Sequence, residues 1–147
     1  MIYKTQPEGF QPEFIVVGIL IEFNKEIVLL RRHEGKSYPG CYGTPGGKME
    51  PKDNNDRIVA TWREALEETG IDLDKDSIES LEEYYVSHRG KNFIYMHHRI
   101  VLDKKPDEIK ISLAEHDVYI WATPEEALTL PLVEDEDFVI KEAYQIA

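Results

Sequence analysis

The stretch that decides the fold is REALEETGI at residues 63–71, which reads as the last turns of a helix and its stop signal. The helix is predicted over residues 56–69, because apolar side chains recur with helical period and Gly70 supplies a C-terminal cap. Its predicted apolar face comprises Ile58, Val59, Trp62, Ala65, Leu66 and the Thr69 methyl group. Glu64, Glu67 and Glu68 fall on the other side, where they repel one another and two of them oppose the helix dipole.

Two interpretations of this glutamate cluster are open, a solvated helix face or a site for a divalent cation. Mg²⁺ prefers oxygen ligands and is commonly held by a few carboxylates together with substrate phosphates. The loop before the helix, TPGGKMEP at residues 44–51, adds two glycines that allow close backbone approach and a cation, Lys48. The combination favours a metal site that joins an acidic protein to an anionic phosphate.

Residues 47–71 resemble the signature of the Nudix hydrolases, G-x5-E-x7-R-E-U-x-E-E-x-G-U, in which U is an aliphatic residue. The second half, REALEETGI, matches at every specified position if Ala65 counts as aliphatic. In the first half Asp53 stands at the position of the family's first glutamate, and nine residues rather than seven separate it from Arg63. The loop PKDNNDR therefore carries two extra residues. With LLRR, YPG and Trp121, the resemblance extends over residues 14–132.

The resemblance implies an α+β fold, a Nudix-like α/β/α sandwich with a mixed β-sheet between helices. It implies one domain over residues 1–147, of which residues 1–11 form a polar N-terminal arm. The implied activity is hydrolysis of a phosphoanhydride linkage in a nucleoside diphosphate derivative, with Mg²⁺ or Mn²⁺ as cofactor. The short chain favours nucleoside triphosphates over ADP-ribose.

The same resemblance implies roles for individual residues. Glu64, Glu67 and Glu68 form the expected metal-binding face, with the carbonyl of Gly46 as a further ligand. Arg63 is expected to orient a glutamate rather than to touch substrate. Glu64 and Glu115 are both candidates for the general base, and the choice between them stays open.

Four residues are candidates for binding the phosphates of the substrate: Arg31, Arg32, Gly47 and Lys48. Arg31 and Arg32 are adjacent on a predicted strand and point to opposite faces, so at most one of them can enter a cleft. His97 and His98 also face apart, so we expect strand packing rather than joint metal binding.

The remaining elements follow from turn and cap signals. Strands at residues 13–23 and 26–32 form a hairpin at Asn24-Lys25, and residues 33–55 are mostly loop. A second hairpin joins residues 81–89 to residues 92–102 across Gly90-Lys91, and another strand covers residues 118–122. Helices are expected at residues 123–128, where Thr123 and Glu126 form a capping box, and at residues 134–146.

Composition narrows the class of partner. The net charge of −12 disfavours nucleic acid polymers and anionic membranes, and the apolar run FIVVGILI is too short to span a bilayer. A single cysteine, Cys41, suits a reducing compartment, so we expect a cytoplasmic protein. We further expect a monomer or homodimer whose partner is a small nucleotide.

Three alternatives remain beside a nucleoside triphosphate hydrolase. One is a non-catalytic Nudix-fold regulator that binds a nucleotide. Another is a pyrophosphatase acting on ADP-ribose or a nucleotide sugar. The third is a protein that merely binds Ca²⁺, although the sequence has no EF-hand loop.

Overall fold

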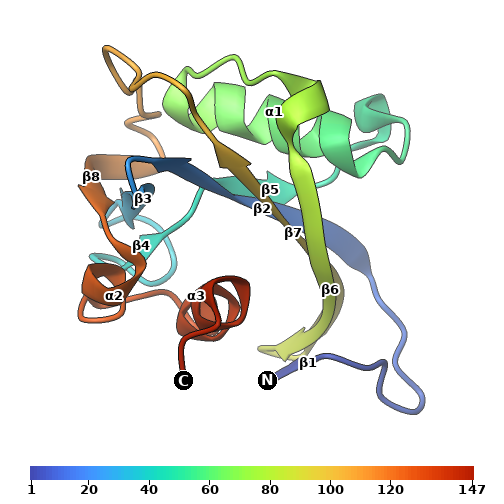
Figure 1. Ribbon diagram of the computed structural model, residues 1–147. Helices are drawn as coiled ribbons and strands as arrows, with labels where there is room; N and C mark the ends of the chain where they lie inside the picture. The colour runs from blue at the N-terminus through green and yellow to red at the C-terminus, as the bar shows by residue number, and fades with distance from the viewer.

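The computed structural model describes residues 1–147, in which a mixed sheet lies between α1 on one face and α2 and α3 on the other (Figure 1). The strands are β1 (Ile2–Tyr3), β2 (Phe14–Phe23), β3 (Glu26–Arg32), β4 (Tyr42–Gly43), β5 (Gly46–Lys48), β6 (Glu79–His88), β7 (Lys91–Val101) and β8 (His116–Ala122). The helices are α1 (Arg57–Thr69), α2 (Pro124–Ala127) and α3 (Glu136–Tyr144), with 3-10 turns η1 (Pro51–Asp53) and η2 (Lys75–Ser77). The predicted α/β/α sandwich is confirmed.

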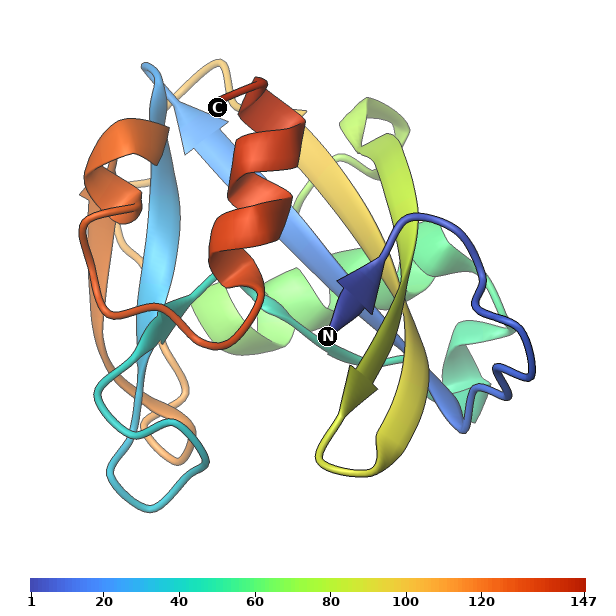
Figure 2. The same cartoon turned by 90° about the horizontal axis from the view of Figure 1, so that it is seen from below.

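The sheet is organised around β2, which has neighbours on both sides. Its strand order is β1-β6-β7-β2-β3-β4, with β5 also paired to β2 and β8 paired to β3. β2 runs parallel to β7 from the pair Phe14 and Phe93 to the pair Glu22 and Val101. β3 pairs with β2 only beside their turn, and β5 takes its place along the other end of β2 (Figure 2). Because β3 pairs with β2 only beside the turn, β5 can pair with the rest of β2, and the glycine-rich segment lies in the middle of the sheet.

Apolar side chains fill both spaces between the layers. The cluster under α1 includes Ile19, Ile21, Val28, Leu30, Ala65 and Ile100. The cluster under α2 and α3 includes Leu20, Ile27, Leu29, Ala122, Ala127 and Ile140. The central part of β2 is buried on both faces because each face is covered by helices.

Helix α1 begins one residue later than predicted and ends at the predicted cap Gly70, but its buried face differs from the prediction. Asp56 caps the first turn by accepting hydrogen bonds from two backbone amides, and Gly70 ends the helix with φ of 74°. Leu66, placed on the apolar face, is 38% exposed, whereas Glu68, placed on the opposite side, is 8% exposed. The small residue Ala65 and the glycines of β5 let the helix approach the sheet closely, so Glu68 fits between them.

The second hairpin is present, but its turn residues are Arg89 and Gly90 rather than Gly90 and Lys91. Both have positive φ, 51° and 77°, as a tight two-residue turn requires. In the N-terminal arm, Ile2–Tyr3 pairs with β6, so the arm adds a strand to the edge of the sheet.

Two buried histidines of β7 lie on opposite faces of the sheet, in agreement with the expected alternation. His98 faces α1, where its Nδ1 lies 3.0 Å from the Gly18 carbonyl and 3.2 Å from the Thr61 hydroxyl. His97 lies against the ring of Tyr95, and neither of its ring nitrogens has a hydrogen-bond partner. Burial lowers the pKa of His97 to about 3 and that of His98 to about 4.

Candidate active site

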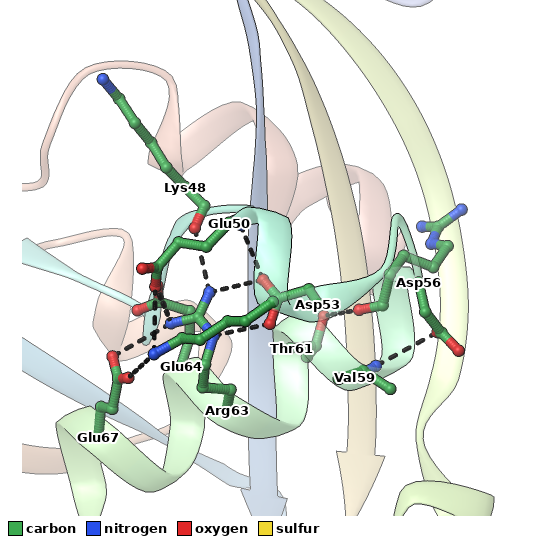
Figure 3. Close-up of polar contacts among 11 residues, drawn as sticks. Lys48, Glu50, Asp53, Asp56, Val59, Thr61, Arg63, Glu64 and Glu67 are labelled. Carbon is green, nitrogen blue, oxygen red and sulfur yellow. Dashed lines mark hydrogen bonds and ion pairs between the residues drawn. The ribbon is translucent and has the colours of Figure 1, made fainter.

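Arg63 is the centre of a charged network at the junction of the glycine-rich loop with α1 (Figure 3). Its Nε and Nη2 each donate to a carboxylate oxygen of Asp53 at 2.8 Å. Its Nη1 donates to Glu64 at 3.0 Å and to Glu67 at 3.2 Å, and lies 2.7 Å from Glu50. One cation therefore holds four carboxylates in place.

The bidentate partner of this arginine is Asp53, the residue that departs from the family signature. It is 1% exposed, and its second oxygen also accepts the backbone amide of Glu50 at 2.8 Å. The hydrogen bonds from Arg63 lower the pKa of Asp53. The loop that carries the extra residues forms η1, which ends at Asp53, and then a left-handed turn at Asn54 and Asn55.

Three glutamates of this network bring oxygen atoms within 4.8 Å of one another: Glu50, Glu64 and Glu67. Three clustered carboxylates suit a hard divalent cation such as Mg²⁺ or Mn²⁺. Glu64 and Glu67 were predicted from the sequence and Glu50 was not. Its signal is a position three residues before Asp53, with which it forms a capping box around η1.

The adjacent glycines of β5 leave the space that this cluster needs. A Cβ built on Gly47 would lie 2.6 Å from both carboxylate oxygens of Glu64. A Cβ built on Gly46 would lie 2.3 Å from the carbonyl oxygen of Val17 on β2. Only glycine permits this close approach of a helix carboxylate to the strand.

Glu68 lies apart from the three-glutamate cluster, on the side of α1 that faces the sheet. One of its oxygens accepts the Gly46 amide at 2.7 Å, and the other lies 3.8 Å from Nδ1 of His116. Burial raises the pKa of Glu68 to about 8 and also raises the pKa of Glu64. No role was assigned to His116 from the sequence.

The two candidate arginines face apart, as the strand alternation predicts. Arg31 pairs with Asp117 at 2.8 Å. Arg32 lines a cavity, and its Nε donates to the carbonyl of Ser37 at 2.9 Å. Lys48 lies with its Nζ 4.1 Å from the ring centre of Phe14.

Glu115 immediately precedes β8 and is half-exposed, with Nζ of Lys36 4.0 Å from its carboxylate. Its charge contributes to raising the pKa of Glu68, so the two acids share one end of the site.

A cavity of about 310 Å³ is lined by residues of the sheet and of α3, and by Glu68 of α1. Gly46, Gly47, Glu68, Arg32 and His116 lie at one part of its wall. Other parts are lined by residues from β1, β2, β6, β7 and α3, including Ile2, Val16, Val86, Phe93, Tyr95, Glu136 and Val139. This volume falls in the range of small-molecule sites. The cavity thus reaches from the predicted motif to the C-terminal helix.

No helix in the structure combines the length and the apolar character that crossing a membrane requires.

Two comparisons with known proteins match most of the chain. The family model described as NUDIX domain matches residues 11–143. A CTP pyrophosphohydrolase from Escherichia coli (strain K12) is 30% identical over 132 residues, which are 88% of this chain and 89% of that protein.

Solved structures show the same fold. The MutT protein from Methanosarcina mazei Go1 is 26% identical with a TM-score of 0.73, covering 92% of this chain and 94% of that one. The NUDIX domain of Shewanella oneidensis NrtR, complexed with ADP ribose, gives a TM-score of 0.78 at 17% identity, covering 96% of this chain and 92% of that one. At that lower identity the likeness concerns the fold alone.

Proposed function

The chain belongs to the Nudix family of pyrophosphohydrolases, and from this premise we propose that it hydrolyses a phosphoanhydride bond of a nucleoside triphosphate using a divalent cation. The observation that carries the proposal is the cluster of Glu50, Glu64 and Glu67 beside Gly47, a residue that also lines the cavity. A nucleotide in the cavity would have its phosphates at this cluster.

The residues present fit Mg²⁺ or Mn²⁺. Glu50, Glu64 and Glu67 would hold the cation, and Glu68 with the Gly46 carbonyl are further proposed ligands on the cavity side. When bound, such a cation neutralises phosphate charge and lowers the pKa of a coordinated water.

The side chains around the cluster have separate proposed tasks. Arg63 keeps the glutamates in position, and it is not one of the residues that line the cavity. Arg32 is the proposed phosphate-binding cation, because Arg31 is paired with Asp117 and therefore less available. Glu64 and Glu115 are the two proposed acceptors for the proton of the attacking water.

The CTP pyrophosphohydrolase relative makes CTP the first nucleotide to test. The test panel consists of CTP, UTP, ATP, GTP and ADP-ribose with Mg²⁺, and the products are resolved by chromatography. We expect a nucleoside monophosphate and pyrophosphate, or a diphosphate and phosphate, from at least one triphosphate.

Glu64→Gln should lower kcat/KM at least about a hundredfold, because it removes one negative charge from the carboxylate cluster. Glu125→Gln, a change of the same kind at an exposed position of α2, should leave the rate within about twofold. Nucleotide binding without any turnover would replace this proposal with the non-catalytic regulator. Hydrolysis of ADP-ribose alone would replace the triphosphate by a different substrate class.

A further inference from the structure

Resting on the proposed function, we propose that Tyr38 is a positioning residue for Arg32, the cation assigned to the substrate phosphates. Tyr38 lies in the loop of residues 33–41, which begins directly after Arg32 at the end of β3 and leads to β4. Its hydroxyl joins His88 and Glu134 in a hydrogen-bonded chain, which we call the tyrosine bridge. All four side chains line the cavity. The bridge and the proposed phosphate-binding cation therefore share one chamber.

The tyrosine bridge joins three segments that are far apart in the sequence. The Tyr38 hydroxyl lies 2.9 Å from Nε2 of His88, the last residue of β6. Nδ1 of the same ring lies 2.7 Å from the carboxylate of Glu134, which precedes α3. An ionised carboxylate only accepts hydrogen bonds, so Nδ1 donates to Glu134 and Nε2 of the neutral ring accepts the hydroxyl. Figure 2 shows the loop and the β6–β7 turn at the same end of the molecule.

Ser37, the chain neighbour of Tyr38, connects the bridge to Arg32. Nε of Arg32 donates to the Ser37 carbonyl at 2.9 Å, and Nη2 donates to the Ser37 hydroxyl at 3.1 Å. The remaining N–H donors of this guanidinium are free for a ligand, and a planar guanidinium can bind phosphate through two parallel hydrogen bonds. The position of Ser37 thus sets the direction in which Arg32 presents its free donors.

The backbone of the loop makes Ser37 dependent on the tyrosine side chain. Tyr38 has φ of 52°, in the left-handed region that a residue with a large side chain rarely adopts. Such a conformation persists only where the surroundings hold it. The ring of Tyr38 lies 5.7 Å from the His88 ring, centre to centre, and the Arg89 guanidinium carbon lies 4.9 Å from its centre. Because Ser37 itself is exposed, the contacts of Tyr38 keep this part of the loop in place.

A purely structural tie and a positioning role differ in what they predict. If Tyr38 only stabilises the loop, its loss acts on the enzyme whether or not Arg32 is present. If Tyr38 positions Arg32, its loss matters only while the guanidinium is there to be misplaced. A double-mutant cycle separates the two roles, because it measures whether the effects of two substitutions add.

The experiment measures kcat/KM for the best triphosphate of the substrate panel. Tyr38→Phe removes the hydroxyl and keeps the ring, and it should lower kcat/KM about tenfold through misplacement of Arg32. Arg32→Ala should lower it about a hundredfold, and adding Tyr38→Phe should change the remaining rate by less than about twofold. Tyr119→Phe removes a hydroxyl from an exposed tyrosine of β8 and should leave the rate within about twofold.

Calorimetric binding of pyrophosphate with Mg²⁺ gives the same cycle without turnover. Tyr38→Phe should weaken this binding several-fold, whereas Arg32→Ala and the double variant should bind equally. His88→Leu removes the same hydrogen bond from the other partner and should reproduce each loss, so the test does not depend on one variant.

Two results would overturn the role of Tyr38: rates and affinities that Tyr38→Phe leaves unchanged, or losses that add in full to those of Arg32→Ala. If no nucleotide is hydrolysed but pyrophosphate binds, the proposed function fails and the pyrophosphate affinities alone decide the role of Tyr38. If the wild-type protein binds no pyrophosphate, Arg32 is not a phosphate-binding cation and the positioning role is rejected with it.

Discussion

Glu68 allows a direct measurement of how much the burial of a carboxylate lowers the free energy of unfolding of the metal-free protein. Burial raises its pKa from an ordinary value of 4.5 to about 8. The folded protein therefore binds a proton that the unfolded chain releases, so this contribution to stability is present at low pH. It is lost as pH rises from about 4.5 towards 8. Glu68→Gln removes the ionisable group, while its amide carbonyl can still accept the Gly46 amide.

The linkage gives the size of the expected effect. Near pH 7 the penalty removed by Glu68→Gln is about 3 kcal/mol, whereas near pH 5 it is at most about 1 kcal/mol. Urea unfolding in EDTA at these two pH values measures both differences. The variant should be the more stable protein, and its advantage should grow with pH.

Glu67→Gln is the matched control, since Glu67 is the adjacent acid on α1 and its side chain is 51% exposed. It should change stability by only a few tenths of a kcal/mol at both pH values. A destabilised Glu68→Gln protein, or a gain that does not depend on pH, would refute the reasoning. Either result would mean that the ionised carboxylate is stabilised by its surroundings.

Three further predictions concern the buried network and the sheet. Arg63→Met should destabilise the protein by about 3–5 kcal/mol in urea unfolding, because it leaves Asp53 buried and unpaired, and the addition of Asp53→Asn should recover part of this loss. Gly47→Ala should lower kcat at least about tenfold with little change in unfolding midpoint, because the flexible Glu64 side chain must shift away from the new methyl group. The ring of His97 is buried and neutral in the folded protein and becomes protonated on unfolding, so it should cost the wild-type protein about 2 kcal/mol of stability between about pH 7 and pH 5. His97→Leu should abolish this part of the loss. An unchanged dependence of stability on pH would contradict this origin.

Much of the fold follows from local signals. Asn24 and Lys25, both with positive φ, form the turn of the first hairpin. Asp56 and Gly70 cap the two ends of α1. These features depend on neighbours in sequence, so periodicity and cap residues predict them. The buried side of α1 was harder to predict, because the glycines of a distant strand decide how closely the helix packs.

The candidate site was predictable only where it coincides with the motif. Glu64 and Glu67 lie in the signature, whereas Glu50 joins them through Arg63 and the turn η1. Asp53 shows that spacing in the sequence does not fix the contact in the structure. Its side chain is shorter than the glutamate of the signature and the loop to Arg63 is longer, yet Asp53 still accepts hydrogen bonds from Arg63. Glu136 has no motif and is brought to the cavity by α3, so tertiary structure alone reveals it.

The parallel pairing of β2 with β7 has a consequence for how the chain folds. Every pair in this ladder joins residues roughly 80 positions apart, and such non-local contacts slow folding because a long loop must close first. The segment from β5 to the end of α1 is contiguous in sequence, and it contains the whole carboxylate cluster. The cavity, in contrast, needs residues from Ile2 to Val139. We therefore expect the acidic motif to take shape early and the chamber beside it to close only in the last, slowest step of folding.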